Sequence, residues 1–288
     1  MTIKGVIVAA GYGSRFLPAT KTLPKEMLPL IDKPAISFIV DEFLEAGIRD
    51  ILIITSRRKK VLDDFFDREV ELETVFTSEG DQQKLQSIQP ADARFYFTRQ
   101  RRMLGTGHAL LLAKTFTGKD PFVVAYPDDI IFSKTSLSRQ LIDAYEKTGK
   151  GVLAVKDMSG DDVSRYGVVD PLDRQNPCAI RALVEKPAPG QEPSSLVSYG
   201  RYLYTHELYP LLEEGLKNHQ GGEFYHVDAI NTLAKAGRMC ALNFEGLRLD
   251  TGDPMGFLEA VCRYALRRPE WSKQAKTLFQ QLAESQDS

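Results

Sequence analysis

The amino-acid sequence predicts an α/β fold, in which a mixed and mainly parallel central sheet is flanked by helices. Three observations lead to this prediction. Strand-like and helix-like patterns alternate over the first half of the chain, which is typical of a parallel sheet. The early strands are uninterrupted apolar runs, as expected for strands that are covered on both faces. From about residue 160, short strand-like runs separated by Pro- and Gly-containing turns indicate a more antiparallel part.

The first half of the chain contains five strand candidates and two helices. One helix begins after Pro34, because its apolar residues recur at helical spacing on one face, and Gly47 ends it. The other is expected over residues 137–145, between the last two strands. The strand candidates are residues 6–9, 51–54, 94–98, 122–126 and 152–155.

The second half and the insertions follow from composition and turn signals. Residues 67–90 are acidic and then Gln-rich, which predicts an inserted arm. Residues 267–288 form a polar C-terminal tail, whose final fifteen residues are expected to form a loosely held helix. Because there is no repeat and no long linker, we expect a single domain over residues 1–288. The predicted elements are strands at 166–169, 180–184 and 198–204 and helices at 227–236 and 257–265.

Composition excludes several classes of protein. An apolar fraction of 43% and a charged fraction of 26% are ordinary for a globular chain and exclude an intrinsically disordered one. The net charge of −2 argues against nucleic acid as a partner, since such proteins usually carry a basic excess. Three widely spaced cysteines and four histidines show neither disulfide nor metal-ligand spacing.

No apolar run reaches the roughly 18 residues of a membrane span. The apolar residues 5–10 run directly into a glycine-rich turn, so a buried strand explains them better than a signal peptide does. We therefore expect no membrane partner and a cytoplasmic location, which the cysteine pattern also favours.

A glycine loop, Gly11-Tyr-Gly13-Ser-Arg15, follows the first strand, where Rossmann-like open sheets bind ligands. It is not a dinucleotide fingerprint, because Phe16 stands in place of the third glycine and no acid ends the second strand. It also lacks the Walker lysine. What remains is a turn whose N–H groups can approach phosphates, with Arg15 and Lys25 nearby, or simply a tight turn with two solvated cations.

Residues 11–29, GYGSRFLPATKTLPKEMLP, closely resemble the signature of bacterial UTP–glucose-1-phosphate uridylyltransferases, which belong to the sugar-nucleotide pyrophosphorylases. The arm segment FDREVELE at residues 66–73 is similar to an insert of the same branch. The resemblance extends over about residues 3–266. Its further motifs are residues 99–100, 105–109, 127–129, 166–169, 184–187, 200–202 and 250–252.

The resemblance implies a nucleotide-diphospho-sugar transferase fold, with residues 3–158 as a nucleotide-binding half and 159–266 as a sugar-binding half. It implies transfer of a uridylyl group from UTP to α-D-glucose 1-phosphate, giving UDP-glucose and pyrophosphate. It further implies Mg²⁺ as cofactor and a homodimer or homotetramer. Such a reaction depends on positioning and electrostatics, because the attacking phosphate oxygen is already ionised.

The resemblance also implies roles for individual residues. Arg15 and Lys25 would bind the triphosphate, and Lys186 would bridge the sugar phosphate and the α-phosphate. Asp128 and Asp250 would hold Mg²⁺, which binds few protein ligands. The remaining residues would be Ala10, Gly11, Gly13, Glu26, Gln100 and Gly105 for the nucleotide, and Asp129, Gly167 and Glu185 for the sugar.

Alternatives remain at this point. Taken singly, Asp128-Asp129 could be a turn, residues 185–187 a solvated strand end and Asp250-Thr-Gly a helix N-cap. The chain could be a catalytically silent paralogue, or could use dTTP or another hexose 1-phosphate.

One segment differs from the family pattern and bears on the choice of sugar. Residues 222–230 read GEFYHVDAI where such enzymes usually read GEIQLTDAI. Tyr225, His226 and Val227 therefore either repack locally or reshape the sugar pocket.

Overall fold

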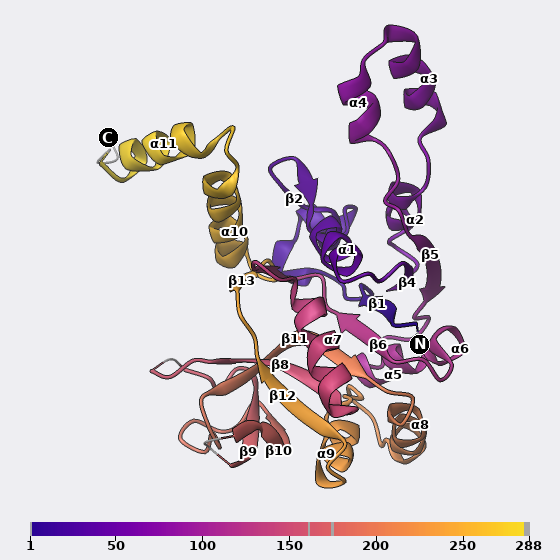
Figure 1. The fold of residues 1–288 in the computed structure, drawn as a ribbon, viewed down its shortest axis with the longest axis vertical. Coiled ribbons are helices and arrows are strands. Elements are labelled where there is room, and N and C mark those ends of the chain that lie inside the picture. Colours follow the sequence, from indigo (N-terminus) through magenta and orange to yellow (C-terminus); the bar gives the residue numbers. More distant parts are fainter. Residues whose placement is uncertain (1, 161, 174–175, 285–288) are drawn as a thin grey trace.

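In the computed structural model, which describes residues 2–160, 162–173 and 176–284, nine strands form one central sheet (Figure 1). The predicted strands are all present, with ends that differ by a few residues. In spatial order the strands are β5 (Arg94–Arg99), β4 (Asp50–Thr55), β1 (Lys4–Val8), β6 (Phe122–Ala125), β11 (Leu196–Tyr204), β8 (Gly151–Asp157), β12 (Met239–Asn243), β10 (Asn176–Glu185) and β9 (Gly167–Asp173).

The sheet is mixed, as predicted. Strands β5, β4, β1 and β6 are mutually parallel, and β12 is parallel to β8. Only β11 and β10 run against the others, because each pairs antiparallel with its neighbours on both sides. The prediction of a parallel first half followed by a more antiparallel part is therefore confirmed.

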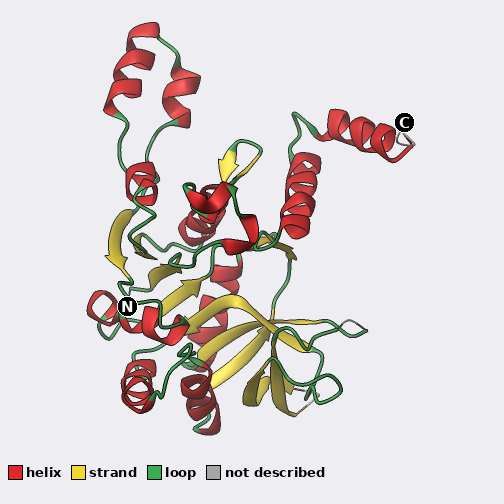
Figure 2. Cartoon of the chain, turned by 180° about the vertical axis from the view of Figure 1, so that it is seen from behind, coloured by secondary structure: helices red, strands yellow, loops and turns green. Residues whose placement is uncertain are grey.

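Helices cover both faces of the sheet (Figure 2). In β1, Val6 and Ile7 point to opposite faces and both are fully buried, which explains why this strand is an uninterrupted apolar run. One face is covered by α1 (Ala35–Glu45), α2 (Val61–Phe66) and α7 (Leu137–Thr148). The other is covered by α5 (Thr106–Leu111), α6 (Lys114–Thr117), α8 (Leu208–Asn218) and α9 (Val227–Lys235).

Two two-stranded ribbons lie outside the sheet and were not predicted. One joins β2 (Pro29–Leu30) to β3 (Lys33–Pro34), and the other joins β7 (Asp129–Phe132) to β13 (Leu247–Asp250). Besides the two hydrophobic cores on the faces of the sheet, there is a small third core, to which both ribbons contribute. In it, Leu30, Ile130 and Leu249 pack against helix α10 (Pro254–Arg267). The α10 helix begins after Asp253, whose side chain accepts from the Met255 and Gly256 N–H groups.

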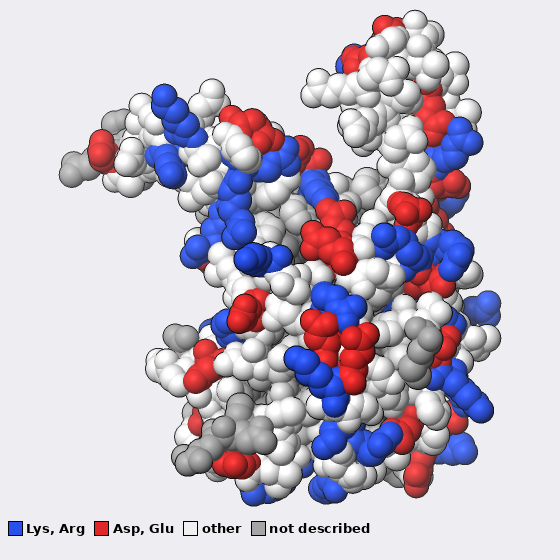
Figure 3. Space-filling model, viewed as in Figure 1, with Lys and Arg blue, Asp and Glu red and all other residues white. Residues whose placement is uncertain are grey.

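The arm and the C-terminal helix project from the body (Figure 1). The arm consists of α3 (Val70–Glu79) and α4 (Gln82–Ser87), and the tail forms α11 (Ser272–Glu284), a helix as predicted; residues 285–288 lie outside the described part. On the face seen in Figure 3, positive and negative side chains are interspersed. Within the described ranges, no helix has both the length and the apolarity that crossing a membrane requires.

Candidate active site

The glycine loop leaves the sheet at the carboxyl end of β1, where the Ala9 N–H still donates to the Ile54 carbonyl at 2.8 Å. Gly13 has a φ of 69°, in the left-handed region that favours glycine. The Thr20 hydroxyl donates to the Gly13 carbonyl at 2.7 Å, so the loop folds back on itself. A Cβ at Gly13 would lie 3.3 Å from the Lys25 Cβ, so this glycine lets Lys25 pack directly beneath the loop.

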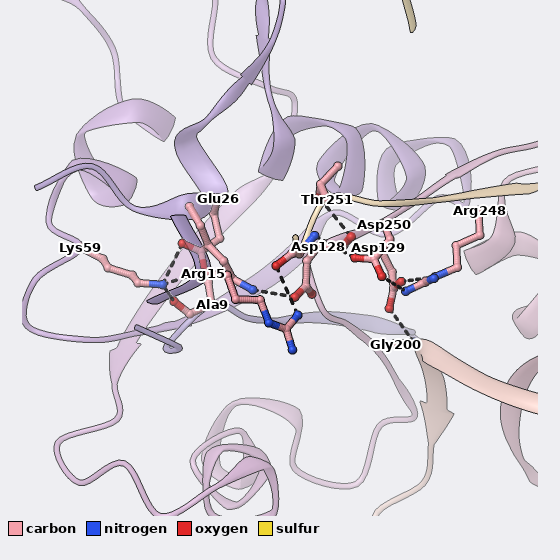
Figure 4. Close-up of polar contacts among 12 residues, drawn as sticks. Ala9, Arg15, Glu26, Lys59, Asp128, Asp129, Gly200, Arg248, Asp250 and Thr251 are labelled. Carbon is pink, nitrogen blue, oxygen red and sulfur yellow. Dashed lines mark hydrogen bonds and ion pairs between the residues drawn. The ribbon is translucent and has the colours of Figure 1, made fainter. Parts of the chain in front are cut away.

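Arg15 of the loop and Lys25 of the turn after it both bond to the acidic side of the site; Figure 4 shows Arg15 beside Asp128. The Arg15 guanidinium donates to the Gly252 carbonyl at 3.3 Å, and the Lys25 ammonium donates to Asp128 Oδ2 at 2.6 Å. Burial alone would lower the pKa of Lys25, but the charge and hydrogen bond of Asp128 outweigh it and raise the pKa. Lys25 is therefore a cation at neutral pH. The structure thus brings Arg15, Lys25, Asp128 and Gly252 together, although Gly252 lies 237 residues from Arg15.

The three acidic residues meet because of the β7–β13 ribbon. Asp128 precedes β7, Asp129 begins it, and Asp250 lies directly opposite Asp129 in the antiparallel register. Side chains alternate along each strand, so the face that carries Asp129 and Asp250 is opposite the face that buries Ile130 and Leu249. The ribbon therefore places two carboxylates from distant parts of the chain side by side.

Arg248 ties these two carboxylates together. Its guanidinium donates to Asp129 Oδ1 at 2.5 Å and to Asp250 Oδ2 at 2.9 Å, and it lies over the Tyr199 ring at 4.4 Å from the centroid. Burial would lower its pKa, but the two carboxylates raise it. On the other side, the Gly200 N–H donates to Asp129 Oδ2 at 3.0 Å, and a Cβ on Gly200 would lie 2.5 Å from that oxygen. Both oxygens of Asp129 are thus held.

Asp128 and Asp250 converge at Gly252. An ideal Cβ on Gly252 would lie 3.1 Å from Asp128 Oδ2 and 3.0 Å from Asp250 Oδ1, so the two oxygens face the same point. The Gly252 N–H donates to Asp250 Oδ1 at 2.8 Å, and the Thr251 N–H donates to the Asp128 carbonyl at 2.8 Å. In the part of the chain that the structure describes, no group of three or more His, Cys, Asp or Glu residues could hold a metal. A cation here would have two carboxylates and would complete its shell with other oxygens.

A buried ion pair supports the loop from below. Lys59, only 4% exposed, donates to both oxygens of Glu26 at 2.7 and 2.8 Å and to the Ala9 carbonyl at 2.7 Å. Burial lowers the pKa of Lys59, with Glu26 opposing the shift. The pair joins the end of β1 to the short 3-10 turn of Lys25–Met27. Lys59 engages both oxygens of Glu26. The contact between Glu26 and uracil stays a prediction.

The predicted base-binding pair is in contact. Gln100 Nε2 donates to the Gly105 carbonyl at 3.0 Å and lies 3.1 Å from His108 Nδ1. Gly105 has a φ of 102°, and a Cβ there would lie 2.6 Å from the Phe224 carbonyl oxygen. Because both the backbone conformation and the space exclude a side chain, glycine is required at this position.

Two of the three predicted sugar-binding residues, Gly167 and Glu185, line a cavity of 230 Å³, whereas Asp129 is not among its lining residues. Gly167 lies opposite Glu185 in the β9–β10 register, and burial raises the pKa of Glu185. The next residue, Lys186, has a φ of 47°, and no hydrogen bond or ion pair of its ammonium occurs among the described residues. A left-handed non-glycine residue is strained and is found most often at functional sites. The cavity is also lined by Thr106, Tyr126, Arg165, Tyr166, Leu183, Ser198, Tyr202, Tyr225, His226 and Val227.

Sequence reasoning missed three residues of this site. Arg248 lies two residues before Asp250, so a strand would place both side chains on one face, and this alternation could have been noticed. Lys59 and Thr106 carry no such signal. Lys59 meets Glu26 across 33 residues, and Thr106 meets His226 across 120 residues.

Comparison with known proteins agrees with the geometry. Residues 4–266 match the model of the family described as Nucleotidyl transferase. The UTP–glucose-1-phosphate uridylyltransferase of Staphylococcus epidermidis is 42% identical over 97% of this chain and 98% of its own length. The UTP-bound UGPase of Acinetobacter baumannii is 33% identical, covers 98% of this chain and all (100%) of its own, and superposes with a TM-score of 0.89.

A second solved structure, a UDP-glucose pyrophosphorylase complexed with UDP-glucose, is 37% identical. The match covers 93% of this chain and 100% of that one, with a TM-score of 0.81. Family match, full-length identity and shared fold thus agree, and this chain belongs to the nucleotidyl transferase family, among its UTP–glucose-1-phosphate uridylyltransferases.

Proposed function

We propose that this chain transfers the uridylyl group of UTP to glucose 1-phosphate, giving UDP-glucose and pyrophosphate. One observation carries the proposal: two cations at the carboxyl end of β1 meet the acidic segments, Lys25 through the Asp128 carboxylate and Arg15 through the Gly252 carbonyl. Membership of the family supports it, as do relatives solved with UTP and with UDP-glucose. Residues 3–158 would bind the nucleotide and residues 159–266 the sugar.

The chemistry requires positioning of two polyanions and no general base. The phosphate oxygen of glucose 1-phosphate is ionised at neutral pH, so it attacks the α-phosphorus directly and the β- and γ-phosphates leave as pyrophosphate. Arg15 would take the leaving phosphates with its planar guanidinium, and Lys25 would lie beside them as a point charge. Ala10, Gly11 and Gly13 would offer the loop backbone to the triphosphate.

Lys186 would stabilise the charge that grows at the α-phosphate. Three observations support this role: its ammonium has no hydrogen-bond partner among the described residues, its backbone has a positive φ, and the preceding residue, Glu185, lines the sugar cavity. Glu185 and the Gly167 backbone would bind sugar hydroxyls, and Asp129 would lie near the sugar phosphate. On the base side, Gln100 and Gly105 would meet uracil, and Glu26 would join them.

We propose Mg²⁺ as the cofactor, held by Asp128 and Asp250. The residues fit this ion, because two carboxylate oxygens face one point above Gly252 and because Mg²⁺ prefers oxygen ligands with few from protein. When bound, Mg²⁺ would neutralise charge on the triphosphate and so favour displacement. Arg248 would fix Oδ2 of Asp250 and the Gly252 N–H its Oδ1, so that the carboxylate is oriented for the cation.

We also propose a homodimer or homotetramer, with the arm as a contact. The arm helix α3 exposes Val70, Leu72 and Val75, and a cavity of 760 Å³ separates the arm from the body. Exposed apolar side chains on a projecting element favour a protein partner. Light scattering on the purified chain tests this, and a monomer at micromolar concentration would contradict it.

The reaction is tested by an activity matrix. We expect pyrophosphate release to be fastest with UTP and glucose 1-phosphate among four triphosphates and several sugar phosphates. Loss of activity in Lys25→Met, beside full activity in Lys21→Met at an exposed lysine four residues earlier, would place the reaction at this site. Faster release with dTTP or another hexose would change the substrate. No release from any pair would favour the catalytically silent paralogue instead.

A further inference from the structure

Three hydrogen bonds join two segments that lie far apart in the sequence. The Phe224 N–H donates to the Leu104 carbonyl at 2.6 Å, and the Gly107 N–H donates to the Phe224 carbonyl at 2.9 Å. The third bond is between side chains: Thr106 Oγ1 lies 2.8 Å from His226 Nδ1. Residues 224–226 are therefore fixed to residues 104–107 at the start of α5.

This joint lies between the two proposed substrate sites. Residues 104–107 include Gly105, whose carbonyl accepts from Gln100 on the base side. Tyr225 and His226 line the sugar cavity, and so does Thr106. A movement of one segment against the other would therefore change the position of the sugar cavity wall relative to the base.

Packing alone does not require a histidine at position 226. Its side chain is 6% exposed and lies edge-on to the rings of Tyr202 and Tyr204, at centroid distances of 5.4 and 6.2 Å. Its Nε2 is buried without a hydrogen-bond partner. An aliphatic side chain would fill the same space without an unpaired polar atom, and leucine is the residue usual in the enzymes that this segment resembles. The interaction that distinguishes histidine from leucine here is the bond to Thr106.

We propose that His226 is a positioning residue that, through the Thr106 hydroxyl, fixes the wall of the sugar cavity against the base-binding loop and thereby sets the preference among hexose 1-phosphates. The inference rests on the proposed uridylyl transfer. Burial lowers the pKa of His226, so the ring is neutral at pH 7 and offers one donor and one acceptor. Either tautomer can pair with a hydroxyl group, which both donates and accepts.

The experiment compares variants that lose the bond with variants that keep it. His226→Leu and Thr106→Val remove it, whereas His226→Asn places an amide atom near the position of Nδ1 and Thr106→Ser keeps the hydroxyl. The matched control is Thr117→Val, which loses a similar buried bond, from Thr117 Oγ1 to the Tyr209 hydroxyl at 2.6 Å, outside the cavity. For each protein, kcat and KM are measured with glucose 1-phosphate and galactose 1-phosphate, together with the Kd of UTP and the Tm.

We expect His226→Leu and Thr106→Val each to lower kcat/KM for glucose 1-phosphate by about 5- to 10-fold, the loss of one hydrogen bond. The kcat/KM for galactose 1-phosphate should fall less, because a displaced cavity wall distinguishes the two sugars less well. The ratio of kcat/KM for glucose 1-phosphate to that for galactose 1-phosphate, which measures discrimination, should therefore decrease. The double variant should lose no more than either single one. His226→Asn and Thr106→Ser should recover most of the loss, and Thr117→Val should lower Tm without changing discrimination.

Two outcomes overturn the inference. One is that His226→Leu and Thr106→Val lower Tm like Thr117→Val while discrimination stays that of the wild type. The other is that His226→Asn and Thr106→Ser behave like the variants that lose the bond. Failure of the proposed function is separate, because the wild-type chain would then release no pyrophosphate from UTP and glucose 1-phosphate.

Discussion

Acidification should destabilise this protein through His226, by an amount that follows from its burial. Burial lowers the pKa of His226 to about 4, from an ordinary 6.5. The folded state therefore binds this proton less readily than the unfolded chain does. Above pH 6.5 the group has no effect on the free energy of unfolding, and as the pH falls from 6.5 to 4 that free energy decreases. At about 1.4 kcal/mol for each pH unit, the loss is about 2 kcal/mol at pH 5 and about 3 kcal/mol at pH 4.

Neither aromatic neighbour interferes with this effect. Burial raises the pKa of Tyr202 to about 12 and raises the pKa of Tyr204 well above its usual range, so both rings stay protonated throughout the window. Burial is also the sole cause of the shift at His226, so no ion pair has to be broken first. The loss therefore belongs to the imidazole alone.

The assay is urea unfolding of the wild type and of His226→Leu at pH 7.5 and pH 5.0. Every other titrating group is common to both proteins, so the difference between their free energies of unfolding isolates His226. We expect that difference to shift by about 2 kcal/mol in favour of leucine between the two pH values. A difference that stays constant would show that His226 gains its proton as easily in the folded state as in the unfolded chain, and would refute the reasoning.

The remaining predictions concern catalysis. Chelation of divalent metal with EDTA should abolish turnover, and Asp128→Asn should lower kcat at least about 100-fold with an unchanged far-UV spectrum; full activity in excess EDTA would rule out the Mg²⁺ site. Lys186→Ala should lower kcat by about 100-fold and change KM much less, and steady-state kinetics in which only KM rises would mean that the lysine merely gathers substrate. In a comparison of kcat/KM values, glucose 1-phosphate should remain the best sugar despite Tyr225; a higher value for galactose 1-phosphate would make Tyr225→Gln the first reversion to assay.

The sheet could be predicted because its strands carry their own signal. Residues 51–54 are buried on both faces, so their apolar run reports the strand without any knowledge of its partners. The β7–β13 ribbon has no such signal. Each strand is four residues long and mixes charged with apolar residues, and Arg248 bonds to Asp129 across 119 residues. Pairing at that separation is set by tertiary packing, which a local pattern does not contain.

The candidate site divides in the same way. Asp128 and Asp250 were predicted individually from the family pattern, and the structure adds the reason why they face each other. Glu26 was assigned to the base from the same pattern, but its buried partner Lys59 has no motif of its own. Local spacing reports which side chains share one element. It does not report which charges from separate elements neutralise each other once water is removed.

The β7–β13 ribbon has a consequence for how insertions and deletions act on this chain. Its four-residue register decides which way each side chain points: Asp250 faces Asp129, and one step along, Leu249 faces Ile130 in the third core. Shifting one strand by a single residue would turn the acidic face inward and the apolar face outward. A one-residue deletion inside β13 would therefore remove the paired carboxylates while leaving all nine strands of the main sheet in place. Exposed turns outside the ribbon should tolerate changes of length better, because they do not set this register.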